Sequence, residues 1–517
     1  MVIMVFILIP IAEVQADTIV YIENGREVEA PSDKSLKDLK TVTSLKDGYK
    51  NYVDYAHGYS IDLPANLKLD VSLSSVRTLA FDDNTRIEIY YDNFFNSTSC
   101  TSTTAFINYN NRTLFNNPNY NITSQRKEVI NGVNAYINTW SREKLAKVKN
   151  DHNYYTYAYF AVADKEVYTV SIKSTAPRTD YDRIIKSFSY LGKKSGSAGI
   201  FTRYAPQEKE WNKETKDFYQ KYFAEDSPLI WGIFEPTAPD SSAHLTYLEK
   251  QFNYTFPVIL VYKALDSTLP LTNLQQAHRL GKTVELTLQT SSFELSEEEN
   301  RQLTYEILQG KYENFFRQYA RQIKTFGHPV LFRFDNEMNG DWCTYSSYYT
   351  AGDTEIYKAL WRYVYDIFAE EEVDNAIWVW NPHDISFPNF KWNHAFLYYP
   401  GDEYVDVVGL TGYNTGNYYS GEIWREFPFI YDQLIRAYDA AFAHPFMITE
   451  FGSNSVGGDK AAWINNMFAS IHKYPRIKIA IWWNGIDWDS QMNPARIYRI
   501  DENQEVMKAF RDGLASP

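Results

Sequence analysis

Two glutamates carry the clearest chemical signal in this sequence. Glu337 stands in the run Phe-Asp-Asn-Glu-Met-Asn-Gly (residues 334–340), and Glu450 stands in Ile-Thr-Glu-Phe-Gly (residues 448–452). Hydrolysis of a glycosidic bond with retention of configuration needs two carboxyl groups roughly 5 to 5.5 Å apart, one as nucleophile and one as general acid and then base. The pair therefore predicts this chemistry if the fold brings both residues together.

The elements around the glutamates predict such a fold. In the second part of the chain, short apolar runs alternate with helices of amphipathic period, which is typical of βα units around a parallel sheet. One such helix is predicted from Tyr312 to Ile323, with Gly327 ending it. The runs of strand length are 229–234, 258–262, 284–288, 330–334, 376–380, 405–410, 446–449 and 477–482. They predict an α/β fold, a (β/α)8 TIM barrel, whose fourth and seventh strands place Glu337 and Glu450 at its mouth.

The sequence around these strands resembles glycoside hydrolase family 26. The similar positions are Arg333, residues 337–342 (Glu-Met-Asn-Gly-Asp-Trp), residues 406–414 (Asp-Val-Val-Gly-Leu-Thr-Gly-Tyr-Asn) and residues 449–452 (Thr-Glu-Phe-Gly). That family contains mainly endo-β-mannanases, with some β-1,3-1,4-glucanases and β-1,3-xylanases. The resemblance implies Glu337 as acid/base, Glu450 as nucleophile and Tyr413 as a donor that orients the nucleophile.

The resemblance also implies a β-linked polysaccharide or oligosaccharide as substrate. The mannanases of the family usually carry His immediately before the acid, whereas this chain has Asn336. Mannan is the first expectation because the family consists mainly of mannanases, and Asn336 leaves β-1,3-1,4-glucan and xylan open as substrates. The linkage, and endo or exo action, cannot be predicted from the sequence.

Further polar residues near the two glutamates are candidates for substrate binding. Arg333 on strand four is the candidate cation beside Glu450, although a structural ion pair below the site is the alternative. Asn336 is expected to bind a sugar hydroxyl. His383, after strand five, could reach the substrate, and a structural histidine is the alternative.

Three tryptophans are candidates for stacking against a sugar ring, because an indole presents a flat apolar face. Trp342 follows the acid by five positions and is expected on the rim, with core packing as the alternative. Trp482 and Trp483 end strand eight. Since successive side chains of a strand point to opposite faces, one of them should face the site, and the sequence does not say which.

The composition limits the other classes of function. A net charge of −14 disfavours nucleic acid and anionic polymers as partners, because both need Lys and Arg to replace their counterions. The sequence contains no glycine-rich phosphate loop after a strand and no metal-ligand motif such as His-Glu-x-x-His. We therefore expect neither a cofactor nor a catalytic metal.

The N-terminal part of the chain predicts export and a second domain. Residues 2–11 are apolar and residues 12–16 (Ala-Glu-Val-Gln-Ala) are similar to a cleavage site, so residues 1–16 are predicted to be a signal peptide, too short for a membrane span. The product would be secreted or held at the cell surface. Residues 17–190 are predicted to form a small α+β domain, 191–200 a linker and 201–517 the catalytic domain.

The predicted α+β domain offers little chemistry. Its clearest strands are residues 86–91 and 167–172, and residues 180–188 are predicted to form a helix. Residues 58–64 (Gly-Tyr-Ser-Ile-Asp-Leu-Pro) and that helix resemble small PsbP-like modules. An accessory, wall-binding or glycan-binding role and a plain structural role are all compatible with it, and its partner is unknown.

A non-catalytic glycan-binding or wall-associated protein is the alternative from another class. Such a protein would use an inactive barrel of the same fold. The presence of both glutamates favours the enzyme, because a binding module needs aromatic rings more than a proton donor.

Overall fold

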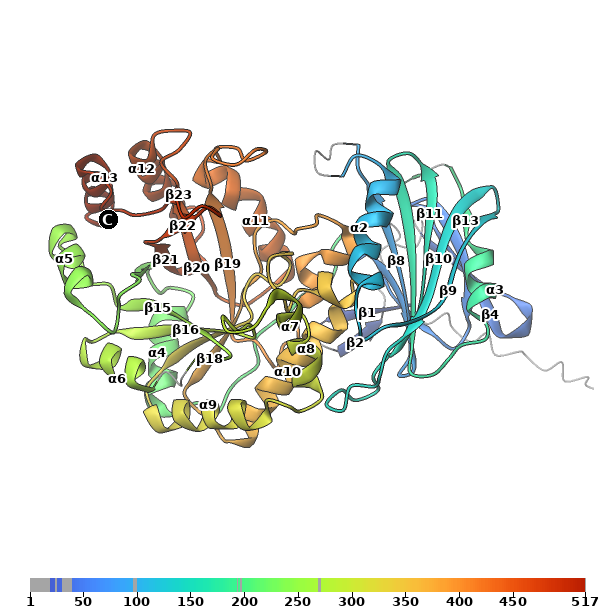
Figure 1. Ribbon diagram of the computed structural model, residues 1–517, viewed down its shortest axis with the longest axis horizontal. Coiled ribbons are helices and arrows are strands. Elements are labelled where there is room, and N and C mark those ends of the chain that lie inside the picture. The colour runs from blue at the N-terminus through green and yellow to red at the C-terminus, as the bar shows by residue number, and fades with distance from the viewer. Residues whose placement is uncertain are drawn as a thin grey trace, which may run out of the picture.

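The computed structural model describes residues 19–23, 26–29, 40–95, 100–192, 194–195, 198–267 and 271–516. A sheet-rich N-terminal module, from β1 (Ile19–Glu23) to β13 (Ser189–Tyr190), lies beside a closed barrel (Figure 1). The predicted signal peptide lies outside the described residues, as do residues 193, 196 and 197 of the predicted linker. Among the described helices, none has both the length and the apolar character of a membrane span.

The described residues of the N-terminal module form two sheets and two α-helices. The larger sheet has the order β2-β1-β6-β7-β8-β12-β11-β10-β9, and the smaller has the order β13-β5-β4-β3. The larger sheet comprises β2 (Arg26–Glu29), β6 (Lys68–Asp70), β7 (Thr78–Phe81), β8 (Thr85–Asn93), β9 (Asn121–Ile130), β10 (Val133–Ser141), β11 (Tyr154–Ala163) and β12 (Glu166–Ser174), together with β1. The smaller comprises β3 (Lys40–Ser44), β4 (Tyr49–Asp54) and β5 (Tyr59–Pro64), together with β13.

The helices of this module have clear local causes. Helix α2 (Thr103–Phe115) begins after Ser102, whose hydroxyl accepts from the Ala105 N–H at 3.1 Å and so satisfies a free donor of the first turn. Helix α3 (Tyr181–Ser187) buries Ile184 and Ile185 in the module's core. The predicted strands 86–91 and 167–172 lie in β8 and β12, and the predicted helix 180–188 corresponds to α3.

The predicted barrel is confirmed. Eight parallel strands close in the order of the sequence, because β21 pairs with β14. Inside the lower part of the barrel, apolar side chains from alternate positions fill the space, among them Leu260, Leu331 and Met447. The strands are β14 (Ile230–Phe234), β15 (Val258–Ala264), β16 (Thr283–Gln289), β17 (Val330–Phe334), β18 (Ala376–Trp380), β19 (Val407–Asn414), β20 (Phe446–Ser453) and β21 (Ile477–Trp483).

Helices surround the barrel (Figure 1). They are α4 (Lys213–Phe223), α5 (Ala243–Phe252), α6 (Leu271–Arg279), α7 (Glu297–Asn300), α8 (Leu303–Leu308), α9 (Glu313–Phe326), α10 (Thr354–Glu370), α11 (Phe427–Ala441), α12 (Lys460–Ile471) and α13 (Gln504–Leu514). The predicted helix 312–323 is α9, and Gly327 ends it with a φ of 72°, a backbone conformation that glycine adopts at little cost. A hairpin of β22 (Ile486–Trp488) and β23 (Pro494–Ile497) follows the last barrel strand.

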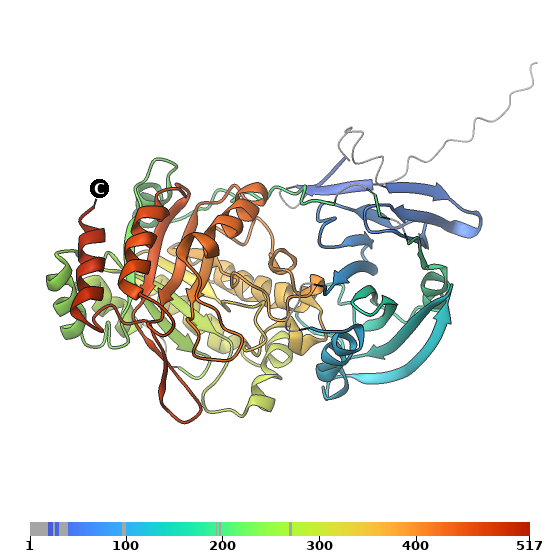
Figure 2. The same cartoon turned by 90° about the horizontal axis from the view of Figure 1, so that it is seen from above.

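The N-terminal module packs against one flank of the barrel (Figure 2). The ring of Phe390, from the barrel's β18–β19 connection, lies 4.5 Å from that of Phe106 in α2. Lys173 of β12 is buried between Glu88 at 2.7 Å and Asp353, the N-cap of α10, at 2.8 Å. Buried charges that depend on each other across a boundary fix the relative placement of the two parts, because separating them would leave charges unpaired.

Candidate active site

The barrel brings the two predicted glutamates to the same end. Glu450 lies within β20, near its carboxyl end, and Glu337 follows β17 by three residues. Both therefore stand at the carboxyl ends of their strands, where TIM barrels place their active sites. Asn336 links the two positions, because its Nδ2 donates to Oε1 of Glu450 at 3.3 Å while Glu337 is its neighbour in the chain.

A β-bulge aims Glu450 into the barrel. In the pairing of β19 with β20, Leu410 lies opposite Ile448 and Thr411 lies opposite Glu450, so Thr449 is an extra residue. Thr449 faces the interior, where its hydroxyl lies 3.1 Å from that of Thr411, and Glu450 also faces the interior. Two consecutive residues of one strand thus point the same way, which a regular strand does not allow.

Four donors surround the Glu450 carboxylate. Arg333 Nη1 donates to Oε1 at 3.0 Å, and Tyr413 donates to Oε2 at 3.2 Å. Tyr262, from β15, donates a short hydrogen bond to Oε2, and Asn336 completes the set. An arginine and three further donors fix the orientation of this carboxylate.

Arg333 is held in place by its own partners. Its side chain is fully buried, with Nε 2.8 Å from Glu285 and 2.7 Å from the hydroxyl of Thr287, while Nη1 donates to Asn381 at 2.9 Å. Burial alone would lower the pKa of Arg333, but Glu285 and Glu450 raise it well above its ordinary value. Both alternatives stated for Arg333 therefore apply, since one guanidinium contacts Glu450 and also forms an ion pair below it.

Glu337 has a different environment. Its backbone φ of 55° lies in the left-handed region, and its N–H donates to the carbonyl of Asn381 at 2.7 Å. Its side chain is 15% exposed, and its pKa is raised to about 7, chiefly by burial and also by Glu450, against the opposing effects of His383, Arg333 and Trp342. This carboxyl group keeps its proton to near neutral pH, as a general acid must.

Trp342 and His383 flank Glu337. The indole Nε1 of Trp342 donates to Oε2 of Glu337 at 3.2 Å, and the residue is 47% exposed, so it lies on the rim as predicted. Nε2 of His383 lies 3.9 Å from Oε1 of Glu337, and the two rings pack edge to face at 5.1 Å. His383 is also tied to the backbone through Nδ1, which lies 2.9 Å from the carbonyl of Ile385.

The two tryptophans of strand eight have different positions. Trp483 is half-buried beside Tyr413, with ring centroids 6.3 Å apart, and stacks on Phe234 at 5.2 Å. Trp482 is fully buried; its Nε1 donates to the carbonyl of Tyr498 and its ring packs against Phe510 of α13. The substrate-binding role predicted for Trp482 is therefore wrong, because its ring lies between the barrel and the outer helices.

Sequence reasoning missed several polar residues of the site. The sequence pattern places Tyr262, Glu285 and Thr287 only within apolar strands and predicts no role for them in the site. Burial raises the pKa of Glu285 to about 8, and Arg333 opposes this rise. These residues could have been found as polar or ionisable residues inside apolar runs at the same level as Arg333, since neighbouring parallel strands bring such residues together.

One group of three potential metal ligands occurs among the described residues, and it lies elsewhere. The ligand atoms of Glu214, His278 and His328 lie within 4.8 Å of one another. Glu214 lies in α4, His278 lies in the helix before β16, and His328 immediately precedes β17. They are at the amino ends of the barrel strands, opposite the glutamates, so this group takes no part in the site.

Comparisons with known proteins agree with this geometry. Residues 284–492 match the family model of glycosyl hydrolase family 26. This stretch of the chain is similar to that family. The matched residues include both glutamates, Arg333 and Tyr413. The PsbP-like character of the N-terminal module stays a prediction.

Individual proteins are also similar to parts of the chain. Endoglucanase H of Acetivibrio thermocellus is 30% identical over 218 residues, which is 41% of this chain and 23% of that protein. A mannan endo-1,4-β-mannosidase of Bacillus subtilis is 34% identical over 182 residues, which is 34% of this chain and 43% of that protein. The chain thus spans less than half of the length of each of these two relatives.

Solved structures are also similar to parts of the chain. A Bacillus subtilis mannanase is 20% identical, with a TM-score of 0.40, over 57% of this chain and 92% of that chain. A Cellulomonas fimi endo-β-1,4-mannanase double mutant is 16% identical, with a TM-score of 0.45, over 61% of this chain and 77% of that chain.

Proposed function

We propose that this protein is a retaining β-glycan hydrolase of the endo-mannanase type. The observation that carries the proposal is the contrast between two carboxyl groups at the mouth of one barrel. Glu450 is held by an arginine and three further donors, whereas Glu337 has a pKa raised to about 7. Two carboxyl groups with such different environments divide the roles of nucleophile and acid.

The proposed reaction has two displacements. Glu450 attacks the anomeric carbon while Glu337 donates its proton to the leaving glycosidic oxygen, which gives a covalent glycosyl-enzyme. The ionised Glu337 then takes a proton from water, whose oxygen attacks the same carbon and releases Glu450. Tyr413 and Tyr262 keep the nucleophile oriented, and Trp342 holds Glu337 and offers an apolar face to a sugar ring.

β-1,4-Mannan is the first substrate that we propose, and it rests on the names of the relatives. Several are mannan endo-1,4-β-mannosidases, whereas one is an endoglucanase. Asn336 stands where the mannanases usually carry His, and it donates to the nucleophile. A β-glucan is therefore the second candidate, and both belong in the assay.

The test is release of reducing sugars from β-mannan, mixed-linkage β-glucan and xylan. Wild type should degrade one of them, and Glu450→Ala should not. Glu337→Ala should lose the polymer activity but keep cleavage of aryl glycosides, whose leaving groups need no proton. Glu372→Ala, which changes an exposed residue between the end of α10 and the amino end of β18, is the control. Full polymer activity in either active-site variant would refute the proposal, and an α-anomer as first product would refute retention.

We further propose that the protein is exported. The support is the apolar run 2–11 followed by a small-residue cleavage site. Sequencing of the mature amino terminus tests this: a mature protein that begins at Asp17 in the medium or on the cell surface is expected, and an intact Met1 inside the cell would contradict it.

A further inference from the structure

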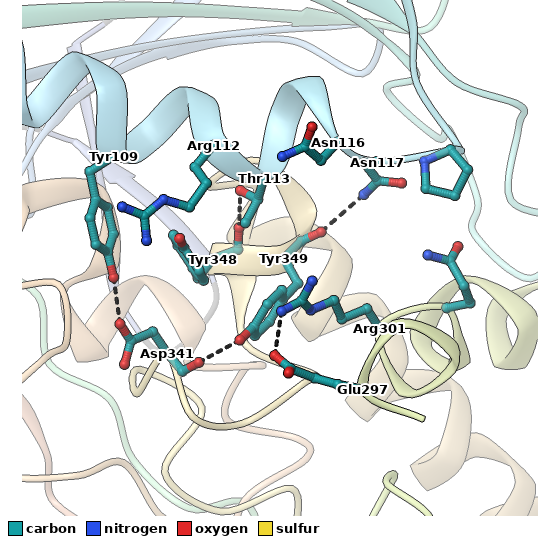
Figure 3. Close-up of a pocket in the computed structure, with 12 residues that line it drawn as sticks. Tyr109, Arg112, Thr113, Asn116, Asn117, Glu297, Arg301, Asp341, Tyr348 and Tyr349 are labelled. Atoms are coloured by element: carbon teal, nitrogen blue, oxygen red, sulfur yellow. Dashed lines mark hydrogen bonds and ion pairs between the residues drawn. The ribbon is translucent and has the colours of Figure 1, made fainter. Parts of the chain in front are cut away.

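A polar cavity lies where the N-terminal module meets the loop that follows Glu337. It has a volume of about 390 Å³, within the range of small-molecule sites. Helix α2 lines one side with Tyr109 and Arg112, and Asp341 and Tyr349 line the other (Figure 3). Both parts of the chain are therefore needed to form this cavity.

Hydrogen bonds hold the two walls at a fixed separation. Tyr109 donates to the carboxylate of Asp341 in a short hydrogen bond, and Thr113 Oγ1 donates to the carbonyl of Tyr348 at 2.7 Å. Asn117 Nδ2 donates to the carbonyl of Tyr349 at 3.1 Å. The cavity is thus a built feature of the interface rather than a gap between loosely placed parts.

The lining suits an uncharged polyhydroxylated ligand. Two guanidinium groups, from Arg112 and Arg301, and two carboxylates, from Asp341 and Glu297, leave no net charge in the cavity. The guanidinium of Arg112 lies 5.4 Å from the ring centre of Tyr109, is exposed, and forms no ion pair with a described residue. Donors, acceptors and aromatic faces in close proximity are what sugar hydroxyls and the apolar face of a pyranose require.

The cavity is connected to the catalytic loop. Asp341 immediately precedes Trp342, whose indole donates to Glu337. Tyr349 donates to the carbonyl of Asp341 at 2.7 Å, so an occupant of the cavity would contact the segment that carries Trp342. A glycan chain bound across the barrel mouth at Glu337 has this cavity as the adjoining polar site on the side of the N-terminal module.

We propose that this cavity is a sugar-binding subsite, in which Arg112 of the N-terminal module binds a residue of a β-glycan some distance from the bond that is cleaved. The inference rests on the proposed glycan-hydrolase function and names a role for the N-terminal module. The module then determines which chain lengths or side branches are preferred.

The experiment measures binding and cleavage as functions of chain length. β-1,4-Linked manno-oligosaccharides and mixed-linkage gluco-oligosaccharides of increasing length are titrated into the Glu450→Gln protein by calorimetry, with and without Arg112→Ala. Affinity should rise with oligosaccharide length. Arg112→Ala should lower the affinity for the longest oligosaccharides about tenfold, since it deletes hydrogen bonds from a charged donor. Arg436→Ala, an exposed arginine on α11, is the matched control and should bind as the parent protein does.

A second variant fills the cavity. Asn116→Trp changes an exposed side chain of α2 that lines the cavity and that makes none of the three hydrogen bonds between its walls. It should weaken the binding of long oligosaccharides as Arg112→Ala does, and it should raise the KM for them more than it lowers kcat. Parent-like affinity for long oligosaccharides in both variants would overturn the subsite.

The outcomes separate the two proposals. If the wild-type chain cleaves none of the glycans but Arg112→Ala still weakens binding, then the hydrolase proposal fails and the subsite stands. If the chain cleaves a glycan and neither cavity variant alters length dependence, then the subsite alone fails.

Discussion

Replacing Trp342 by Phe should shift the alkaline limb of the pH–activity profile to higher pH. The indole N–H donates to Glu337 at 3.2 Å and stabilises the ionised carboxylate, so its loss raises the pKa of that group. A hydrogen bond to a charged group contributes about 1.5–3 kcal/mol when buried. Because Trp342 is 47% exposed, solvent screening reduces this contribution by about half, to about 0.75–1.5 kcal/mol. At 1.36 kcal/mol per pH unit, the pKa of Glu337 rises from about 7 to about 7.5–8.

The assay is the pH dependence of kcat/KM on an oligosaccharide, which reports the free enzyme. The acid must be protonated, so a higher pKa keeps the variant active at more alkaline pH, while Phe retains an aromatic face for the sugar. Trp211→Phe is the control, because it removes an indole that donates to the carbonyl of Ala376 at the opposite end of the barrel. An alkaline limb that stays in place or moves to lower pH would refute this reasoning.

Three further predictions concern other buried groups. Tyr262→Phe should lower kcat about 10- to 100-fold by removing a hydrogen bond to Glu450; unchanged kcat with a lower melting temperature would show a structural role only. Burial raises the pKa of Asp335 to about 8, so the folded state holds a proton that the unfolded state loses, and stability falls as pH rises from about 4 to about 8. In Asp335→Asn the free energy of unfolding, measured by urea titration, should fall less steeply over this range, by up to about 1.36 kcal/mol per pH unit. Lys173→Met should lower the free energy of unfolding by about 3–5 kcal/mol, because Asp353 stays buried without its cation; a smaller loss than about 1 kcal/mol would contradict the pairing.

The sequence predicted the barrel because its wall is built from apolar runs. In β17 and β18 the predicted and observed bounds agree, since those strands are apolar along most of their length. In β19 and β20 the strands continue beyond the predicted ends, to Asn414 and Ser453. The extra residues include Thr411, Tyr413 and Glu450, whose polar side chains bond within the site and which an apolar pattern cannot detect.

The catalytic residues were predicted better than their neighbours. Glu337 and Glu450 stand in recognisable motifs. Tyr262 is the fifth residue of the otherwise mainly apolar strand β15, and it donates to Glu450 only because the closed barrel brings the two strands together. For Trp482, by contrast, the sequence pattern was not sufficient to predict the side chain's position. Alternation along a strand predicts that two adjacent rings face opposite sides, but which ring faces the site depends on register, which no local pattern contains.

Most of the N-terminal module could not be predicted. Strand β9 alternates partly buried and exposed polar residues, and α2 is rich in Thr and Asn, so neither has the apolar periodicity on which the predictions relied. The role of α2 depends on contacts more than two hundred positions away, such as that of Tyr109 with Asp341. Such contacts follow from the docking of two modules and not from local sequence.

The bulge at Thr449 makes the orientation of Glu450 independent of the alternation that packs the lower barrel interior. In an unbroken strand, one alternation would govern both, and any change of phase in the wall would turn Glu450 away. Because of the additional residue, the inward direction of Glu450 does not follow from the alternation that points Met447 inward. Substitutions in the lower interior can therefore leave the orientation of Glu450 unchanged. If the strand kept Thr449 but lost the bulge, the regular alternation that points Met447 and Thr449 inward would turn Glu450 toward the outer helices.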